Sequence, residues 1–380
     1  MLVVAVAAAM VAATPAGAVS DAAPGPSAGS VVDPAARPLF RLSDPRVDEA
    51  SGLAVGTRSP DVLYVHNDSG DRPRFFALDA ATGRVLAECD VPGADNVDWE
   101  DIATGLDSRG VPSVWLADIG DNDASRRDVV VYRVDEPDLA GAGATVRTAA
   151  PDVWRLRYPD GPRNAEAVFV DPVSHRIYLA TKSLLGSTEV FLAPPLPTGA
   201  QVATLARIGS VRLSFTGTSG GPNVIGQLTV TGASMAPVAA GGSAGAEASV
   251  LALRTYTDAY LWRVHGSDVA AALRAKPVRV ALPPQPLGEG VAVRGQELLA
   301  DSEGVGSVVY SVPIPSALLT AAAQPAASAA RARPADPTAA SQRQVSGRTS
   351  AWPVVAAAGC AIIAAGVVAA ARRWRMRRSR

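Results

Sequence analysis

Four glutamates stand at the start of a similar short phrase in different parts of the chain. They are Glu49 in EASGLAV, Glu100 in EDIATG, Glu166 in EAVFVDP and Glu289 in EGVAV, and a fifth copy, GASMAP, carries Ser234 instead. The copies are 51, 66, 68 and 55 residues apart. Carboxylates that lie close together raise one another's pKa unless a cation intervenes, and such hard oxygen ligands suit Ca²⁺ or Mg²⁺. The repeated acidic position therefore indicates a candidate Ca²⁺ site, provided that the fold brings the copies together.

A second set of polar residues ends the strand-like segment that follows each phrase, and Arg163 precedes one of the glutamates. His66 is the candidate general base in this set, because His175 and His265 lie in apparent turns. The expected ligand-binding residues are Glu49, His66, Asp68, Glu100, Asp118, Arg163, Glu166, Lys182, Arg254, Glu289 and Glu303, and the candidate metal ligands are Glu49, Asp68, Glu100, Asp118 and Asp121.

The elements that must position these residues are short strands. Each interval between phrases has room for four segments rich in Val, Leu and aromatic residues, and a period of this length is typical of propeller blades. The fifth repeat has only three such segments, whereas residues 38–42 stand unassigned before the first repeat. An N-terminal strand that completes the last blade leaves no free sheet edge. We therefore predict an all-β propeller of five four-stranded antiparallel blades; six blades and an open β-sandwich are the alternatives.

In a propeller the first strand of every blade lines the central channel, so the repeated glutamates converge on one axis. An architectural interpretation stays open beside the functional one. In that interpretation the glutamates accept hydrogen bonds from the neighbouring blade, while HNDSGD and DIGDN are turns whose side chains cap their own backbone.

The two ends of the chain differ in composition from residues 37–315, the expected propeller. Residues 1–18 have an apolar run and an Ala-Gly-Ala cleavage pattern and are predicted to be a signal peptide, although a retained N-terminal anchor is the alternative. A linker is expected at 19–36 and an Ala/Pro-rich stalk at 316–350. Residues 351–371 carry no charge and precede six arginines in 372–380, which predicts one transmembrane helix with a cytoplasmic tail. The expected location is the plasma membrane, with a single span and the propeller outside.

Charge and cysteine content exclude several classes of function. The net charge is −1, but residues 1–315 carry −10 because the arginines gather near the C-terminus, so nucleic acid is not expected as a partner. Two cysteines give no disulfide framework. The chain has no GxGxxG, no P-loop and no GxSxG in a strand-to-helix setting, so no nucleophile or nucleotide motif is present.

The phrases EASGLA, HNDSGD, EDIA, DIGDN, YPDGPRNAEA with ATKS, VTGAS, ALRTY and QPLGEG span residues 48–304. In this combination the chain resembles a family of secreted or surface-attached bacterial β-propeller proteins of high-GC Gram-positive type. The resemblance implies the fold and the topology but no activity. Related chains usually read VTGAD-x-SPDG where this one reads VTGASMAP, so the fourth blade lacks a carboxylate there.

These observations favour a surface-anchored propeller that binds a small ligand, a metal ion or a cell-envelope partner at the polar mouth of its channel. The first alternative is a Ca²⁺-assisted hydrolase of a lactone or phosphoester, in which His66 or a carboxylate moves a proton. The second alternative is a structural interaction module. No cofactor other than Ca²⁺ is expected, and the C-terminal helix makes the membrane a partner.

Overall fold

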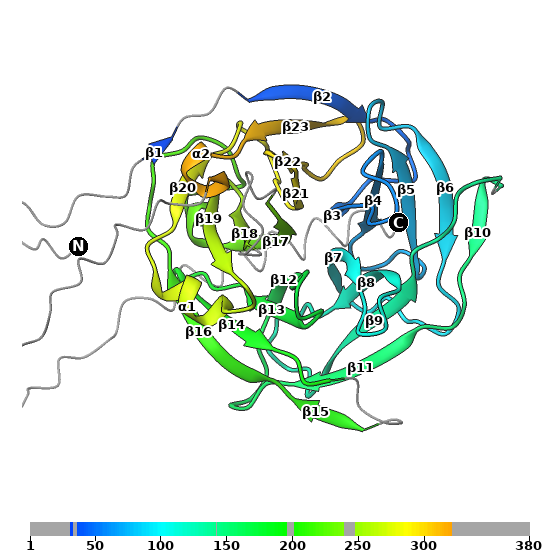
Figure 1. Ribbon diagram of the computed structural model, residues 1–380, viewed down its shortest axis with the longest axis horizontal. Helices are drawn as coiled ribbons and strands as arrows, with labels where there is room; N and C mark the ends of the chain where they lie inside the picture. Colours follow the sequence, from blue (N-terminus) through cyan, green and yellow to red (C-terminus); the bar gives the residue numbers. More distant parts are fainter. Residues whose placement is uncertain (1–30, 33–35, 142, 196–200, 239–247, 321–380) are drawn as a thin grey trace, which may run out of the picture. The chain divides into compact units, whose positions relative to one another are not determined.

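The structure is a computed structural model, and it describes residues 31–32, 36–141, 143–195, 201–238 and 248–320. Five antiparallel sheets stand around a common centre, which confirms the predicted five-bladed propeller (Figure 1). Among the described residues, no helix is long and apolar enough to cross a membrane. The predicted signal peptide, the span at 351–371 and the tail at 372–380 lie outside the described residues, as does the stalk beyond residue 320.

The first two blades contain the strands that the sequence predicts. Blade one consists of β3 (Ala50–Val55), β4 (Val62–Asn67), β5 (Arg74–Asp79) and β6 (Val85–Asp90). Blade two consists of β7 (Trp99–Leu106), β8 (Pro112–Asp118), β9 (Val129–Asp135) and β11 (Asp152–Arg157).

Blades three and four follow the same order from the centre outward. Blade three consists of β12 (Ala165–Val170), β13 (Ile177–Thr181), β14 (Ser187–Leu192) and β16 (Ala206–Arg212). Blade four consists of β17 (Val230–Pro237), β18 (Ala248–Thr255), β19 (Asp258–His265) and β20 (Val278–Ala281). The helical elements are a 3-10 helix, η1 (Val224–Leu228), together with α1 (Val269–Arg274) and α2 (Ser316–Leu319).

Blade five closes the ring with a strand from the other end of the propeller. It consists of β21 (Val291–Arg294), β22 (Glu297–Ala300), β23 (Ser307–Pro313) and β2 (Arg37–Leu42). The N-terminal strand β2 pairs antiparallel with β23, with Arg37 opposite Ser311 and Leu42 opposite Ser307. The predicted closure by residues 38–42 is therefore confirmed.

Three blades carry a fifth outer strand, which the prediction of four strands did not include. β10 (Thr145–Arg147) joins β6, β15 (Val202–Thr204) joins β11, and β1 (Val31–Val32) joins β20, all in parallel. Each of these strands comes from the chain of the following blade and covers an outer edge. One boundary is corrected as a result: the predicted linker at 19–36 contains β1.

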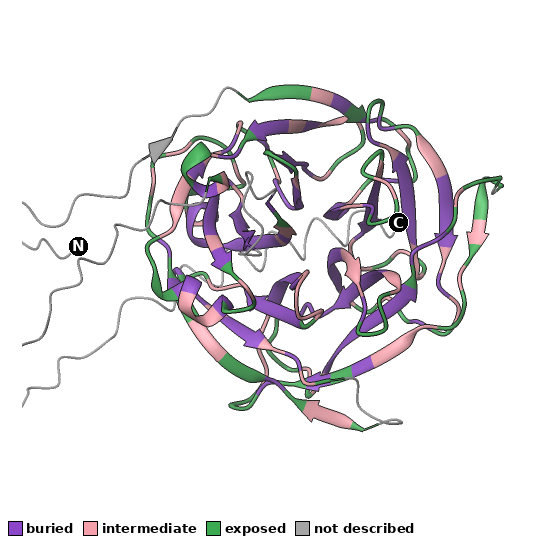
Figure 2. Cartoon of the chain, in the orientation of Figure 1, coloured by how far each residue is buried: buried purple, intermediate pink, exposed green. Residues whose placement is uncertain are grey.

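The hydrophobic core lies between neighbouring blades rather than in one central mass. Each of the five pairs of adjacent blades encloses its own cluster of buried side chains. Between blades two and three, for example, Trp115 belongs to the same cluster as Phe191, and both are about 1% exposed. Figure 2 shows the inner strands as almost continuously buried. The inner strands therefore have fixed positions, and so have the residues at their ends.

The side chain of Asp101 joins several inner strands near the centre of the ring. Its Oδ2 accepts hydrogen bonds from the amides of Val168 in β12 (2.9 Å) and Ala233 in β17 (3.1 Å), and its Oδ1 accepts one from Ile102 (2.9 Å). A Cβ on Gly52 of β3 would lie 2.9 Å from Oδ1, so β3 also approaches this carboxyl closely. Four of the five inner strands thus meet at Asp101.

The two ends differ in chemistry. Beyond Asp101, where the inner strands end, lies a cavity of about 320 Å³ that is lined mainly by small and apolar residues such as Ala54, Ala103, Val170 and Met235. At the other end, where the inner strands begin, lie the repeated glutamates. That end is called the channel mouth below.

Candidate cation site at the channel mouth

The repeated glutamates meet at the channel mouth, as their positions in the sequence predicted. Glu100 and Glu166 are the second residues of β7 and β12. Glu289 lies just before β21, and Glu49 lies just before β3. Glu100, Glu166 and Glu289 are 5%, 2% and 4% exposed, and Glu49 is half-buried. The carboxylates of Glu166 and Glu289 both act on Lys182, which places them around the same centre.

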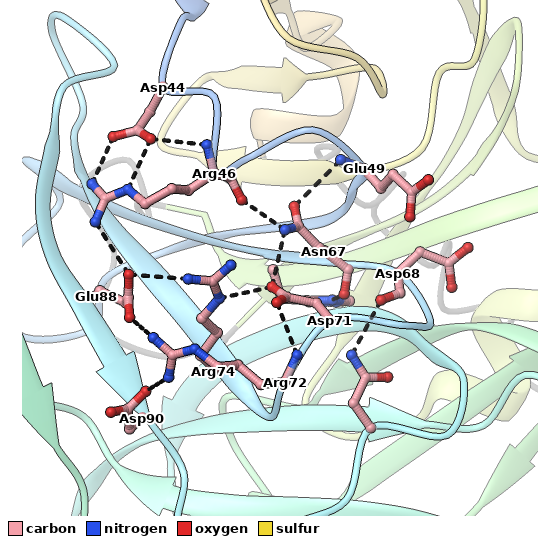
Figure 3. Close-up of polar contacts among 12 residues, drawn as sticks. Asp44, Arg46, Glu49, Asn67, Asp68, Asp71, Arg72, Arg74, Glu88 and Asp90 are labelled. Carbon is pink, nitrogen blue, oxygen red and sulfur yellow. Dashed lines mark hydrogen bonds and ion pairs between the residues drawn. The ribbon is translucent and has the colours of Figure 1, made fainter. Parts of the chain in front are cut away.

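The loop that carries Asp68 is held by Asn67, the last residue of β4. Its Nδ2 donates to the carbonyl of Arg46 (2.7 Å) and to Oδ2 of Asp71 (3.0 Å), while its Oδ1 accepts from the amide of Glu49 (3.3 Å). Figure 3 shows that the side chains of Glu49 and Asp68 then point the same way. On the other side, Arg46, Arg72 and Arg74 form ion pairs with Asp44, Asp71, Glu88 and Asp90.

Three carboxylates at the mouth have the spacing of metal ligands. One carboxylate oxygen each from Asp68, Asp98 and Glu100 lies within 4.8 Å of the other two. Oxygens around a Ca²⁺ ion at 2.3–2.6 Å are separated by distances of this size. Glu100 is only 5% exposed, so its carboxylate is largely withdrawn from solvent. Asp68, Asp98 and Glu100 are called the acidic trio below.

Asp98 is positioned by a buried ion pair in blade two. Asp118 at the end of β8 accepts hydrogen bonds from the amides of Val97 (3.4 Å) and Asp98 (3.0 Å) and pairs with Arg126 (2.8 Å). Burial raises the pKa of Asp118, and the charge of Arg126 opposes that rise. The predicted ligand Asp118 is therefore turned toward the backbone that presents Asp98, beside the trio rather than in it.

The backbone at Gly120 lies directly against the trio. A Cβ at this position would overlap Oε1 of Glu100 and Oδ2 of Asp98. Its amide donates to the carbonyl of Asp98 (3.1 Å). Glycine is therefore required here for the two carboxylates to keep their places.

The electrostatics of the mouth disfavour ionised acids. Burial, and then the charges of Glu166, Asp68 and Asp98, raise the pKa of Glu100 well above its ordinary value. Burial, and then the charges of Asp68 and Glu49, raise the pKa of Glu303 to about 8. A cation placed among these groups would favour their ionised forms.

One lysine stands among the carboxylates. Nζ of Lys182 lies 2.9 Å from Oε1 of Glu166 and 3.4 Å from the hydroxyl of Tyr256. Burial alone would lower the pKa of Lys182, but Glu166, Tyr256 and the other glutamates raise it well above its ordinary range. Lys182 is therefore a charged partner of Glu166.

Arg254 lies beneath the mouth and is fully buried. Its guanidinium donates to the carbonyls of Gly290 and Asp301 and to Oε1 of Gln285 (2.6 Å). Burial lowers its pKa to about 10. Arg254 thus fastens blade four to the start of β21, while Oε2 of Glu289 is buried and has no hydrogen-bond partner in the described part of the chain.

Three other predicted residues face elsewhere. His66 is 0% exposed, packs edge-on against Trp99 and has a pKa that burial lowers to about 4. Asp121 accepts from the amides of Ser125 and Arg126 and so caps its own turn. Arg163 pairs with Glu189 of β14 (3.2 Å).

Comparisons with known proteins identify no family. No family model matches the chain, and no curated protein does. Among solved structures, it is similar to a glucose dehydrogenase (12% identity, 74% of this chain, 100% of that chain, TM-score 0.38). It is also similar to a soluble aldose sugar dehydrogenase from Escherichia coli in the apo form (12% identity, 74% of this chain, 99% of that chain, TM-score 0.37). A chain of a mitotic checkpoint complex matches with 13% identity and a TM-score of 0.33, and the match covers 70% of this chain and 64% of that chain. At these identities and TM-scores the likeness carries no argument.

The sequence analysis missed Asp98, Tyr256 and Gly120 at the mouth and the central role of Asp101. Asp98 precedes β7 by one residue and Gly120 follows β8, so both lie next to phrases that had been singled out. The two adjacent acids Glu100 and Asp101 could have indicated that Asp101 has a role of its own. In a strand successive side chains point to opposite sides, although the register shift between Trp99 and Asp101 interrupts that alternation.

Proposed function

We propose that this propeller binds a divalent cation, Ca²⁺, at its channel mouth through the acidic trio of Asp68, Asp98 and Glu100. The proposal rests on the carboxylate of Glu100, which is almost fully buried beside other acids whose charges raise its pKa. Burying a charged group among like charges is costly, and a cation offsets that cost. The two neighbouring carboxylates at metal-ligand spacing support the same conclusion.

Ca²⁺ suits this set better than Mg²⁺. Ca²⁺ accepts 6–8 oxygen ligands in flexible geometry, whereas Mg²⁺ demands near-octahedral ligands and keeps several waters. The trio comes from two loops and one strand and offers three carboxylate ligands; water or oxygens of a small ligand would complete the coordination. We also propose that the chain presents this site on the cell surface, because the apolar run at 351–371 precedes a strongly basic tail.

Binding is preferred to hydrolysis in this proposal. The candidate general base His66 is fully buried against Trp99, so the hydrolase alternative would depend on a carboxylate at the mouth for proton transfer.

The test is calorimetric titration of the EDTA-treated full-length chain with Ca²⁺ and, separately, with Mg²⁺. The wild-type chain should bind one Ca²⁺ more tightly than Mg²⁺, and Glu100→Gln should weaken Ca²⁺ binding at least about tenfold, since ligand charge sets the affinity of such sites. Glu297→Gln is the matched control: it removes the same charge on the outside of blade five, where Glu297 pairs with Arg37. Absence of Ca²⁺ binding by the wild-type chain, or equal binding by Glu100→Gln, would refute the proposal.

A further inference from the structure

The exposed large hydrophobic side chains of the described residues all lie at one end of the propeller. Val97 precedes β7, Leu184 and Leu185 connect β13 to β14, and Val305 connects β22 to β23. Because neighbouring strands are antiparallel and every inner strand begins at the mouth, these connections all lie on the mouth face. The six residues, with their exposed fractions, are Val97 (58%), Leu184 (44%), Leu185 (87%), Phe215 (58%), Val224 (58%) and Val305 (53%).

The loops that present Phe215 and Val224 are fixed by hydrogen bonds. Thr216 and Thr218 each donate through Oγ1 to the buried carboxylate of Asp258 (2.8 Å). The amide of Leu213 donates to the carbonyl of Gly186 (2.8 Å), which ties this connection to the one that carries Leu184 and Leu185. These apolar side chains are therefore held in the solvent by built loops. Leu184, Leu185, Phe215 and Val224 are called the apolar rim below.

The apolar rim borders the acidic mouth. Gly226 of the same connection packs against Tyr256, since a Cβ there would lie 3.2 Å from its ring, and Tyr256 contacts Lys182. Glu289 acts electrostatically on both Lys182 and Tyr256, and its Oε2 is buried without a hydrogen-bond partner in the described residues. The charges that act on Glu289 are those of Glu303, Lys182, Glu166 and Arg254.

Glu289 and Glu303 need a donor that the acidic trio does not provide. The trio comes from blades one and two, whereas Glu289 and Glu303 belong to blade five and repel each other. Asp68 of the trio also acts on Glu303, so the trio adds negative charge to this pair and no donor. A side-chain ammonium or guanidinium satisfies both charge and hydrogen bonding, because all of its polar hydrogens are donors. Protein interfaces are often centred on a few desolvated anchor residues, Arg among them, surrounded by contacts that exclude water.

We propose that the mouth face docks a polypeptide segment that inserts a lysine or arginine toward Glu289 and Glu303 and rests apolar neighbours on the apolar rim. This inference goes beyond Ca²⁺ binding and uses different carboxylates. The same acidic mouth opposes contact with an anionic lipid surface, because like charges repel across it.

The test is a selection of nine-residue peptides from a random displayed library on the immobilised full-length chain. Selected peptides should share one lysine or arginine flanked by apolar residues. Binding of one such synthetic peptide, measured by fluorescence anisotropy, should fall at least tenfold with Leu185→Ser, with Phe215→Ser and with Glu289→Gln. Replacing the basic residue of the peptide by norleucine should have the same effect. Leu185 and Phe215 are exposed, so these two variants should fold normally and take up Ca²⁺ as the wild-type chain does.

Arg176→Ala, in a connection at the opposite end, is the matched control and should bind the peptide normally. Selected peptides without a basic residue, or equal binding by the rim variants, would overturn the proposal. Binding of phosphatidylcholine and phosphatidylserine vesicles through the apolar rim would also overturn it. So would free butylamine that displaces the peptide with an affinity equal to that of the peptide. Loss of Ca²⁺ uptake with retained peptide binding would refute the proposed function alone.

Discussion

Glu303 at the channel mouth gives a prediction whose sign and size follow from its surroundings. The pKa of Glu303 is about 8 in the folded protein, against about 4.5 for an exposed glutamate. The folded state therefore binds the proton of Glu303 more tightly than the unfolded state does. This difference stabilises the folded state fully below pH 4.5, and the stabilisation is lost as the pH rises from 4.5 toward 8. Glu303 is partly exposed, and solvent screens its interactions, so only part of the pKa shift contributes to stability. We therefore expect the free energy of unfolding of the metal-free protein to fall by about 2 kcal/mol between pH 5 and pH 7. Glu303→Gln should remove this loss.

The assay is urea unfolding of EDTA-treated full-length protein at pH 5, 6 and 7, followed by tryptophan fluorescence. Glu297→Gln in the same blade is the control of opposite sign. Arg37 and other groups outweigh burial and lower the pKa of Glu297, so its pairing contributes stability that is lost as the pH falls. Saturating Ca²⁺ should reduce the pH dependence of the wild-type protein, since a cation favours ionised neighbours. If Glu303→Gln and wild type change in parallel from pH 5 to pH 7 without Ca²⁺, the reasoning about the mouth is wrong.

Three further outcomes follow from the structure. Gly120→Ala should abolish Ca²⁺ uptake while costing less than about 2 kcal/mol of stability, because its Cβ displaces side-chain ends rather than core atoms; Gly143→Ala, whose Cβ meets nothing within 4 Å, should bind Ca²⁺ normally in the same titration. Deleting residues 37–42 should expose β23 and cause aggregation, measured by light scattering, and a monomer as stable as the full chain would contradict this. Protease added to intact cells should release the propeller; a protected propeller with a cleaved C-terminal tail would refute the predicted orientation across the membrane.

The fold was predictable from the sequence because its signal is repeated. The short strands alternate with turns at a blade-length period, and the single unmatched segment at 38–42 matched the single missing strand of blade five. The outer strands β10 and β15 were not predictable in the same way. Each has three residues and pairs with another blade, so no local pattern distinguishes it from a loop.

The site was predictable only in part. The repeat located Glu49, Glu100, Glu166 and Glu289, because their positions follow from the topology of a propeller. The orientation of side chains in the loops depends on partners distant in sequence: Arg163 turns to Glu189, and Asp118 turns to the backbone of Asp98. His66 was chosen for its chemistry, whereas its burial against Trp99 depends on the packing of blade one on blade two.

The strand order of blade five also determines how the propeller bears mechanical load. The chain leaves the ring through β23, which lies between β22 and β2 and is hydrogen bonded to both. A pull on the C-terminal side of β23 is therefore shared by two ladders, whereas the last strand of an unclosed ring would hang at an edge on one. In single-molecule stretching from the C-terminal side, removal of residues 37–42 should lower the unfolding force of blade five more than that of the other blades. Closure by an N-terminal strand thus makes β23, from which the chain leaves the ring, an internal strand of its blade rather than an edge strand.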